Sequence, residues 1–213
     1  MNAPGAVPAL LVASFNPGKA RELRALVEAA GYQVVTLADI GLAAAAYEES
    51  GATYEENGVG KARHYARLSG RVSIADDSGI EVDALGGRPG VQSARYGGPG
   101  LDDTGRNRLL LDELRGVPEG RRTARYVAVA VIARPDGEAR VFHGVCEGRI
   151  TDAPRGAGGF GYDPLFFHPP ICATFAEVDP ARKHEVSHRG RALQALATFL
   201  ASAEGRRFLG GPA

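Results

Sequence analysis

Two kinds of apolar pattern recur along this chain, and they predict both strands and helices. Continuous apolar runs at residues 8–14, 33–36 and 72–75 are typical of buried strands. Helices are predicted at residues 20–30, 54–68, 102–114 and 191–201, and in 20–30 and 102–114 the leucines return at helical spacing. Two long segments rich in β-forming residues, 122–133 and 139–150, flank Pro135-Asp136-Gly137 and predict a hairpin.

The sharpest polar interruption of an apolar run is Asp76-Asp77-Ser78-Gly79. Because Gly79 permits a positive φ, we expect the backbone to turn there, so that the three polar side chains project from the end of a sheet. Adjacent carboxylates repel unless a divalent cation neutralises them or one of them accepts a proton. The alternative is a polar turn whose Asp side chains bond local amides, and this segment alone leaves both interpretations open.

A second polar segment joins the first predicted strand to the first helix and reads Ser14-Phe15-Asn16-Pro17-Gly18-Lys19. A helix N-terminus presents unpaired amides and a positive dipole end to an anion, and Lys19 adds a full charge. The spacing of a Walker loop is absent. A phosphate cradle and a plain connection both remain open.

Composition narrows the classes of function. The formal net charge is zero and 44% of the 213 residues are hydrophobic, which is typical of a globular domain and argues against DNA or RNA as the partner. Residues 1–11 lack a basic segment and a long apolar span, so neither a signal peptide nor a membrane helix is predicted, and we expect a cytoplasmic protein. The two cysteines, Cys146 and Cys172, suit a reducing compartment and are expected in the core.

The basic residues carry a signal of their own, because only three of the 25 are lysine. An ammonium meets a phosphate oxygen as a compact point charge, which the planar fork of arginine does not reproduce. Lys19, Lys61 and Lys183 are therefore candidates for function.

Three more segments bear on chemistry. Glu48 and Glu49 form a second acidic pair, either a solvated loop or part of a site for a hard cation. The glycine-rich segment 156–164 brings two aromatic residues to a loop that either binds a planar ligand or simply turns. Ser187 is a natural N-cap, which would set His188 and Arg189 at a helix N-terminus as donors.

Taken together, seven spaced motifs between residues 9 and 200 resemble the inosine triphosphate pyrophosphatase family, also called dITP/XTP pyrophosphatases. All three lysines fall on motif positions. The motifs are Ser14-Phe15-Asn16-Pro17-Gly18-Lys19, Glu48-Glu49-Ser50-Gly51, Glu56-Asn57 with Lys61-Ala62-Arg63, residues 74–79, residues 85–90 with Ser93-Ala94-Arg95-Tyr96, residues 158–164, and Ser187-His188-Arg189-Gly190.

The resemblance implies an α/β fold with two lobes around a long central mixed β-sheet with flanking helices, and an active site in the cleft between the lobes. Residues 1–203 would form this single domain, and residues 204–213 a frayed tail. It also implies a homodimer, and Mg²⁺-dependent hydrolysis of non-standard purine triphosphates between the α and β phosphates.

Site roles follow from the same resemblance, residue by residue. Asp77 would be the proton acceptor and, with Glu49, would bind Mg²⁺; Asp76 could share or replace that metal role. Ser78 would touch the substrate. The triphosphate would be held by Ser14, Phe15, Asn16, Pro17, Gly18, Lys19 and Lys61. The base would be held by Phe160, Gly161, Tyr162, Asp163, Lys183, His188 and Arg189.

This chain departs from the family pattern at three positions. Phe15 stands where a small or polar residue is usual, and Gly58 and Gly60 replace better helix formers beside Lys61. Two other functions stay open: a phosphatase that uses an Asp nucleophile and releases orthophosphate, and a nucleotide-binding module without catalysis.

Overall fold

The computed structural model describes residues 9–43 and 45–210. The chain opens with a β-α-β unit made of β1 (Ala9–Val12), α1 (Pro17–Ala29) and β2 (Gln33–Thr36). β1 pairs in parallel with β2 and also with β3 (Ser73–Val82), with Leu11 opposite Ser73. The loop that leaves β1 therefore lies beside the continuing part of β3, where the acidic residues are.

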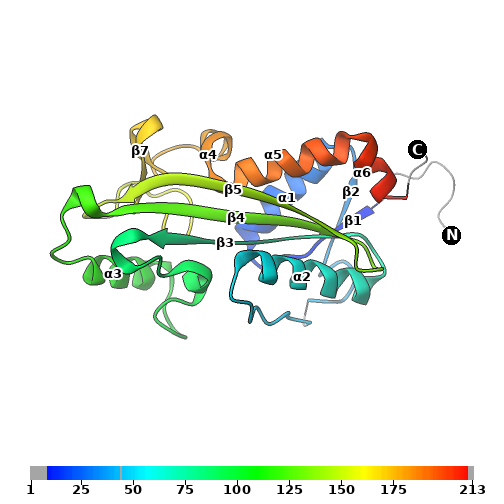
Figure 1. Ribbon diagram of the computed structural model, residues 1–213, viewed down its shortest axis with the longest axis horizontal. Helices are drawn as coiled ribbons and strands as arrows, with labels where there is room; N and C mark the ends of the chain where they lie inside the picture. The colour runs from blue at the N-terminus through cyan, green and yellow to red at the C-terminus, as the bar shows by residue number, and fades with distance from the viewer. Residues whose placement is uncertain (1–8, 44, 211–213) are drawn as a thin grey trace. The chain divides into compact units, whose positions relative to one another are not determined.

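The described strands form one sheet in the order β2-β1-β3-β4-β5-β6-β7 (Figure 1). β5 pairs with β6 and β6 with β7 in antiparallel fashion, so the sheet is mixed, and the α/β class and mixed sheet expected from the resemblance are confirmed. The remaining strands are β4 (Thr123–Ala133), β5 (Ala139–Ile150), β6 (Phe166–His168) and β7 (Ala173–Thr174). The remaining α-helices are α2 (Tyr54–Ser69), α3 (Asp103–Glu113), α4 (Pro180–Val186), α5 (His188–Ala201) and α6 (Ala203–Phe208).

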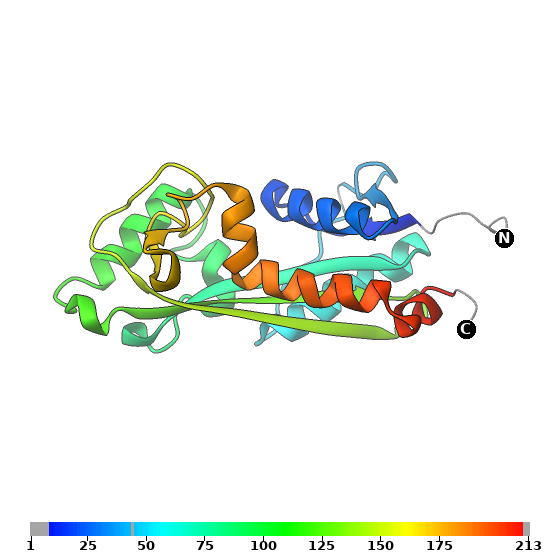
Figure 2. The ribbon, with the colours of Figure 1, turned by 90° about the horizontal axis from the view of Figure 1, so that it is seen from above.

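The chain divides into two compact units, and each has its own buried residues. Among the described residues, unit 1 comprises those up to Asp77, residues 129–143 and residues 192–210. In it α1 runs alongside β1 and β2 (Figure 2), and Leu23 and Val27 of α1 are fully buried, as are Leu10 and Leu11 of β1. Unit 2 comprises residues 78–128 and 144–191. Its core is a cluster of residues from β3, α3, β4 and β5 and from residues 162–175. The expected position of the active site relative to these units stays a prediction.

Helix α2 is unbroken despite its two glycines. A capping box starts it, in which Thr53 and Glu56 bond each other's backbone amides, and Gly70 ends it in the left-handed conformation. A Cβ on Gly60 would lie 2.0 Å from the hydroxyl of Tyr47, and one on Gly58 would lie 3.1 Å from Val131. The glycines thus mark close approaches of the helix to its neighbours.

The predicted turn at Gly79 is wrong, because β3 continues from Ser73 to Val82. The strand is central in the sheet, and Ile80 and Val82 are completely buried. Burying these side chains favours continuing the strand over turning at the glycine. Asp76, Asp77 and Ser78 therefore lie inside a strand.

The last helices also differ from the sequence prediction. α5 begins at His188, three residues earlier than expected, and the short helix α4 before it was not predicted. The tail expected to fray from residue 204 is helical as far as Phe208, whose buried ring packs edge-on against Phe199. Residues 211–213 of that tail lie outside the described residues. In the described part of the chain, no helix has the length and apolarity needed to cross a bilayer.

Candidate functional site

The loop from β1 to α1 is shaped by its capping residue. Asn16 is the N-cap of α1, and its side-chain oxygen accepts a hydrogen bond from the backbone amide of Lys19 at 3.1 Å. Pro17 occupies the first helical turn, where a missing amide hydrogen leaves no hydrogen bond unmade. Phe15 is 49% exposed, with its ring 6.3 Å from that of Tyr65. The unusual phenylalanine therefore does not displace the helix start.

Two lysines of unit 1 pair with carboxylates. The Nζ of Lys19 lies 3.3 Å from Oδ2 of Asp76, which is only 1% exposed. The Nζ of Lys61 donates to Oε1 of Glu49 at 2.5 Å. Burial alone would lower the pKa of Lys61, but Asp76, Glu49 and Asp77 together raise it above its ordinary value. The ammonium is therefore firmly charged.

Asp77 lies next to these pairs in unit 1. The side-chain amide of Asn57 donates to its Oδ2 at 3.0 Å. Burial raises the pKa of Asp77 and the charge of Glu49 raises it further, whereas Lys19, Lys61 and Asn57 act in the opposite direction; the net shift is upward. A carboxylate with a raised pKa is a stronger proton acceptor than an exposed one.

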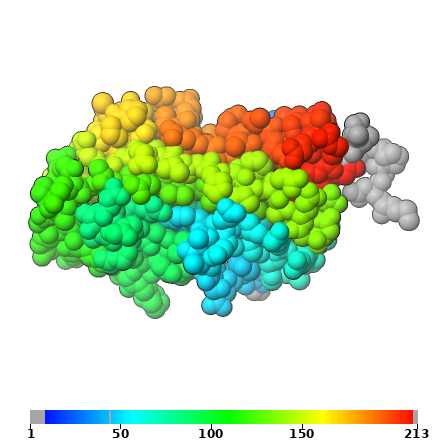
Figure 3. Space-filling view, viewed as in Figure 1, coloured from blue at the N-terminus to red at the C-terminus, as the bar shows by residue number. Residues whose placement is uncertain are grey.

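The segment that carries Glu49 is irregular, and α2 holds it through one stripe of side chains. Residues 57, 61 and 65 stand four apart and so share a helix face. Asn57 accepts from the amide of Gly51, Lys61 pairs with Glu49, and the hydroxyl of Tyr65 donates to the carbonyl of Ala45. In Figure 3, residues of this segment and of α2, in shades of cyan, lie at the surface of the visible face.

The acidic residues suit a hard divalent cation in chemistry. They supply carboxylate oxygens, the donors that Mg²⁺ prefers, and Mg²⁺ commonly takes only one or two protein carboxylates together with substrate phosphates. Within residues 9–43 and 45–210, no group of three or more His, Cys, Asp or Glu side chains is arranged as a metal site. Glu49 and Asp76 instead pair with lysines.

Unit 2 holds the residues predicted to bind a base. Asp163 is 2% exposed; its Oδ2 accepts from the amide of Phe160 at 2.8 Å and from Lys183 at 2.5 Å. The Nζ of Lys183 lies 4.5 Å from the ring centre of Phe160, and the guanidinium carbon of Arg189 lies 5.5 Å from it. Two cations therefore lie close to the phenyl ring of Phe160.

Two strands of unit 2 position His188 and Arg189. A guanidinium nitrogen of Arg189 donates to the hydroxyl of Ser78 on β3 at 2.9 Å. The ring of Tyr126 on β4 stacks on that of His188 at 4.4 Å, and the Tyr126 hydroxyl donates to Asp163 at 3.4 Å. Ser187 accepts from the amide of Gly190, so the predicted N-cap is confirmed.

The glycine-rich loop is fixed by α3. The amide of Gly161 donates to Asp103 at 2.7 Å, and the carbonyl of Gly161 accepts from Asn107 at 3.0 Å. The Tyr162 hydroxyl donates to the carbonyl of Ser93. Tyr162, one of the residues predicted to bind the base, is therefore buried and supports the loop.

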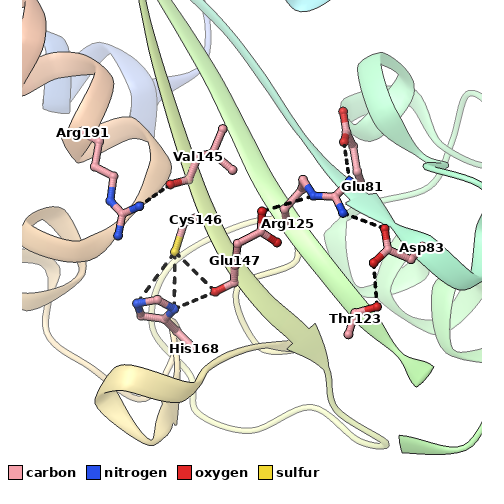
Figure 4. A network of polar contacts seen from close by, with 9 residues as sticks. All are labelled: Glu81, Asp83, Thr123, Arg125, Val145, Cys146, Glu147, His168 and Arg191. Carbon is pink, nitrogen blue, oxygen red and sulfur yellow. Dashed lines mark hydrogen bonds and ion pairs between the residues drawn. The ribbon is translucent and has the colours of Figure 1, made fainter. Parts of the chain in front are cut away.

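Other charged groups of unit 2 form a separate network (Figure 4). Arg125 pairs with Glu81, Asp83 and Glu147. Cys146 is buried beside His168, and burial raises the pKa of its thiol to about 11. Cys172, by contrast, is exposed, so its expected place in the core is wrong.

The predicted site residues thus gather in two groups. Residues 14–19, Glu49, Lys61, Asp76 and Asp77 belong to unit 1, and Ser78, residues 160–163, Lys183, His188 and Arg189 belong to unit 2. The sequence assigned no role to Asn57 or Tyr126. For Asn57 a signal existed, its position four residues before Lys61; for Tyr126 the only signal was β-propensity.

The fold and this part of the site define an α/β protein that has a lysine-bearing helix N-terminus beside buried carboxylates. Comparison with known sequences narrows this class. The sequence profile of the Ham1 family matches residues 10–199, and the chain belongs to that family. The resemblance noted in the sequence is confirmed.

Relatives and solved structures agree with this assignment. The chain is 50% identical over 187 residues to a dITP/XTP pyrophosphatase of Thermus thermophilus, covering 88% of this chain and 89% of the relative. It is 46% identical over 198 residues to one of Methylococcus capsulatus, covering 92% and 98%. The structure of a HAM1 protein from Coxiella burnetii matches with a TM-score of 0.85 at 36% identity, covering 92% of this chain and all of that one.

The junction of α4 and α5 yields a stability prediction at Gly190. A Cβ there would lie 1.7 Å from the backbone carbonyl oxygen of His184. Helix propensity alone predicts that Gly190→Ala stabilises the protein by about 1 kcal/mol, whereas the clash predicts destabilisation by about 1 to 3 kcal/mol. We expect destabilisation, measured by urea unfolding. Gly120→Ala is the control, since nothing lies within 4 Å of its added Cβ, and an equal loss in both variants would contradict the explanation.

Proposed function

We propose that this protein hydrolyses non-standard purine nucleoside triphosphates, such as ITP, dITP and XTP, to the monophosphate and pyrophosphate. The observation that carries the proposal is the set of lysine–carboxylate pairs of unit 1, Lys19 with Asp76 and Lys61 with Glu49. It combines the cations that a triphosphate needs with the oxygen ligands that a hard cation needs. The shared name of the relatives, dITP/XTP pyrophosphatase, supports the same reaction.

The triphosphate binds to residues 14–19 and Lys61. The N-terminus of α1 offers its dipole to the anion, and Lys19 and Lys61 exchange their carboxylate partners for phosphate oxygens. This exchange leaves the charge of each lysine neutralised before and after binding. Glu49 and Asp76 then lose their lysine partners, so that they hold a cation more strongly than in the absence of the triphosphate.

Glu49 and Asp77 would hold Mg²⁺, and Asp76 could share this role. When bound, the metal would neutralise charge on the phosphoryl oxygens and so make the phosphorus atom more open to attack by water. Asp77 accepts a proton from the attacking water, and the bond between the α and β phosphates breaks, so that pyrophosphate leaves. Asn57 holds the Asp77 carboxylate through Oδ2.

The base is recognised by the residues of unit 2. Phe160 offers a flat face for stacking, and Lys183, His188 and Arg189 supply donors. Inosine and xanthosine carry a carbonyl at purine position 6, which accepts from such donors, whereas adenosine carries an amino group there. A homodimer and a cytoplasmic location, both implied by the resemblance and the composition, remain parts of the proposal.

The reaction is tested by its product and its metal. Purified protein given ITP, XTP or dITP with Mg²⁺ should release pyrophosphate, and excess EDTA should abolish turnover, because the carboxylates then repel the triphosphate. The two products are measured separately. Orthophosphate as the first product would support an aspartyl-phosphate phosphatase, and nucleotide binding without turnover would support a non-catalytic module.

The division of labour within unit 1 is tested by substitution. Asp77→Asn removes the proton acceptor with little change of shape, so we expect kcat to fall about a hundredfold or more while substrate still binds. Lys19→Ala should mainly raise KM, because its phosphate contact exists before the transition state as well as in it. Arg24→Ala, on the exposed side of the same helix, is the control. If Asp76→Asn is inactive while Asp77→Asn keeps near-full turnover, the two carboxylates have exchanged roles.

Base selectivity is tested at Arg189 and Phe160. A donor of the protein that faces the amino group of ATP stays unpaired, which is unfavourable by about 1 to 3 kcal/mol. Arg189→Ala removes such a donor, so the variant should lose most of the preference for ITP over ATP. Phe160→Ala should weaken the binding of ITP and of ATP about equally, because every base has an aromatic face that can stack. The measurement is kcat/KM for ITP, XTP, GTP and ATP, with the exposed Arg191→Ala as the control. A wild-type enzyme that hydrolyses ATP as well as ITP would disprove the assignment.

A further inference from the structure

Asn57 connects two segments of unit 1 that carry proposed metal ligands. Its side chain is 1% exposed, its amide nitrogen donates to Asp77 at 3.0 Å, and its amide oxygen accepts from the backbone amide of Gly51 at 2.7 Å. A buried amide left without partners is destabilising by about 1 to 3 kcal/mol. Both ends of this amide are used, one on β3 and one on the segment that contains Glu49.

The orientation of the Asn57 amide is determined by its partners. A backbone N–H can only donate, so the amide oxygen must face Gly51, and the NH₂ group must then face the carboxylate of Asp77. The bond to the carboxylate is charge-assisted and hence the stronger of the two. No other arrangement of this side chain satisfies both neighbours, which makes the link specific to asparagine at this length.

The segment approaches Asn57 so closely that only glycine fits at residue 51. A Cβ on Gly51 would lie 2.7 Å from the amide oxygen of Asn57 and 2.8 Å from Cβ of Glu56. The next two amides, of Ala52 and Thr53, donate to the carboxylate of Glu56. The first turn of α2 therefore holds residues 51–53 in place, two residues beyond Glu49.

We propose that Asn57 is a positioning residue that holds the segment of Glu49 against Asp77, so that both carboxylates face one divalent cation. This inference rests on the proposed function. Outer groups that orient metal ligands typically change metal affinity by about 10- to 100-fold when they are lost. Asn57 acts through Asp77 and through the backbone of Gly51, and it does not itself touch the substrate.

The test uses Mn²⁺ as the probe, in full-length protein without nucleotide, with the free ion followed by electron paramagnetic resonance. Asn57→Leu removes both hydrogen bonds at similar volume, and Gly51→Ala disturbs the same link from the other segment. We expect both variants to bind Mn²⁺ at least about tenfold more weakly than the wild type. The Mg²⁺ concentration for half-maximal turnover should rise by a similar factor.

A control separates positioning from general stability. Thr151→Val removes a buried hydroxyl that bonds the carbonyls of Ala153 and Leu165 in unit 2, so it should lower the melting temperature without changing Mn²⁺ affinity. If circular dichroism shows that Asn57→Leu is unfolded, Gly51→Ala still tests the inference, because that variant retains the Asn57 side chain.

The outcomes that overturn the inference differ from those that overturn the proposed function. Unchanged Mn²⁺ affinity and unchanged Mg²⁺ dependence in the folded variants would show that Asn57 is only structural. Absence of Mn²⁺ binding by the wild type would also refute it, because the two carboxylates would then share no cation. In both cases, release of pyrophosphate by the wild type would leave the proposed function standing.

Discussion

The structure of unit 1 depends on placing two adjacent carboxylates inside a central strand. Asp76 and Asp77 are almost completely buried, and an unpaired ionised group there would be strongly destabilising. Two helices of unit 1 supply the partners of these carboxylates. Lys19 of α1 meets Asp76, and Asn57 of α2 meets Asp77.

Close approach is the second constraint, and glycines provide it. Gly51, Gly58 and Gly60 occupy positions where a Cβ would meet Asn57, Val131 or Tyr47. Glycine within a helix is unfavourable by about 1 kcal/mol relative to alanine. The lower helix propensity is offset because the close approach of α2 to its neighbours lets Asn57 bond Asp77 and Lys61 bond Glu49. The glycines that weaken the helix in isolation are thus the ones that let it support the site.

Sequence patterns predicted much of this arrangement, because the signals involved are local. Strand and helix patterns located β2, β4, β5 and α2 closely. The continuation of β3 through Gly79 was not predictable in this way, since it depends on pairing with neighbouring strands. Tyr126 gave no signal either, because a tyrosine in a strand is ordinary until His188 and Asp163 are seen beside it. Contacts between distant segments are what the local pattern lacks.

The three lysines of the chain share one kind of environment. Each pairs with a carboxylate in the structure, Lys19 with Asp76, Lys61 with Glu49 and Lys183 with Asp163, while the remaining basic residues are arginines. An ammonium has three donors that rotate about one bond, so it can keep one acceptor while taking up another. A guanidinium must turn its whole plane to do the same, and its five donors are harder to satisfy in a buried site. Under the proposed function Lys19 and Lys61 pass from a protein carboxylate to a phosphate oxygen, and lysine is therefore better suited than arginine to these two positions.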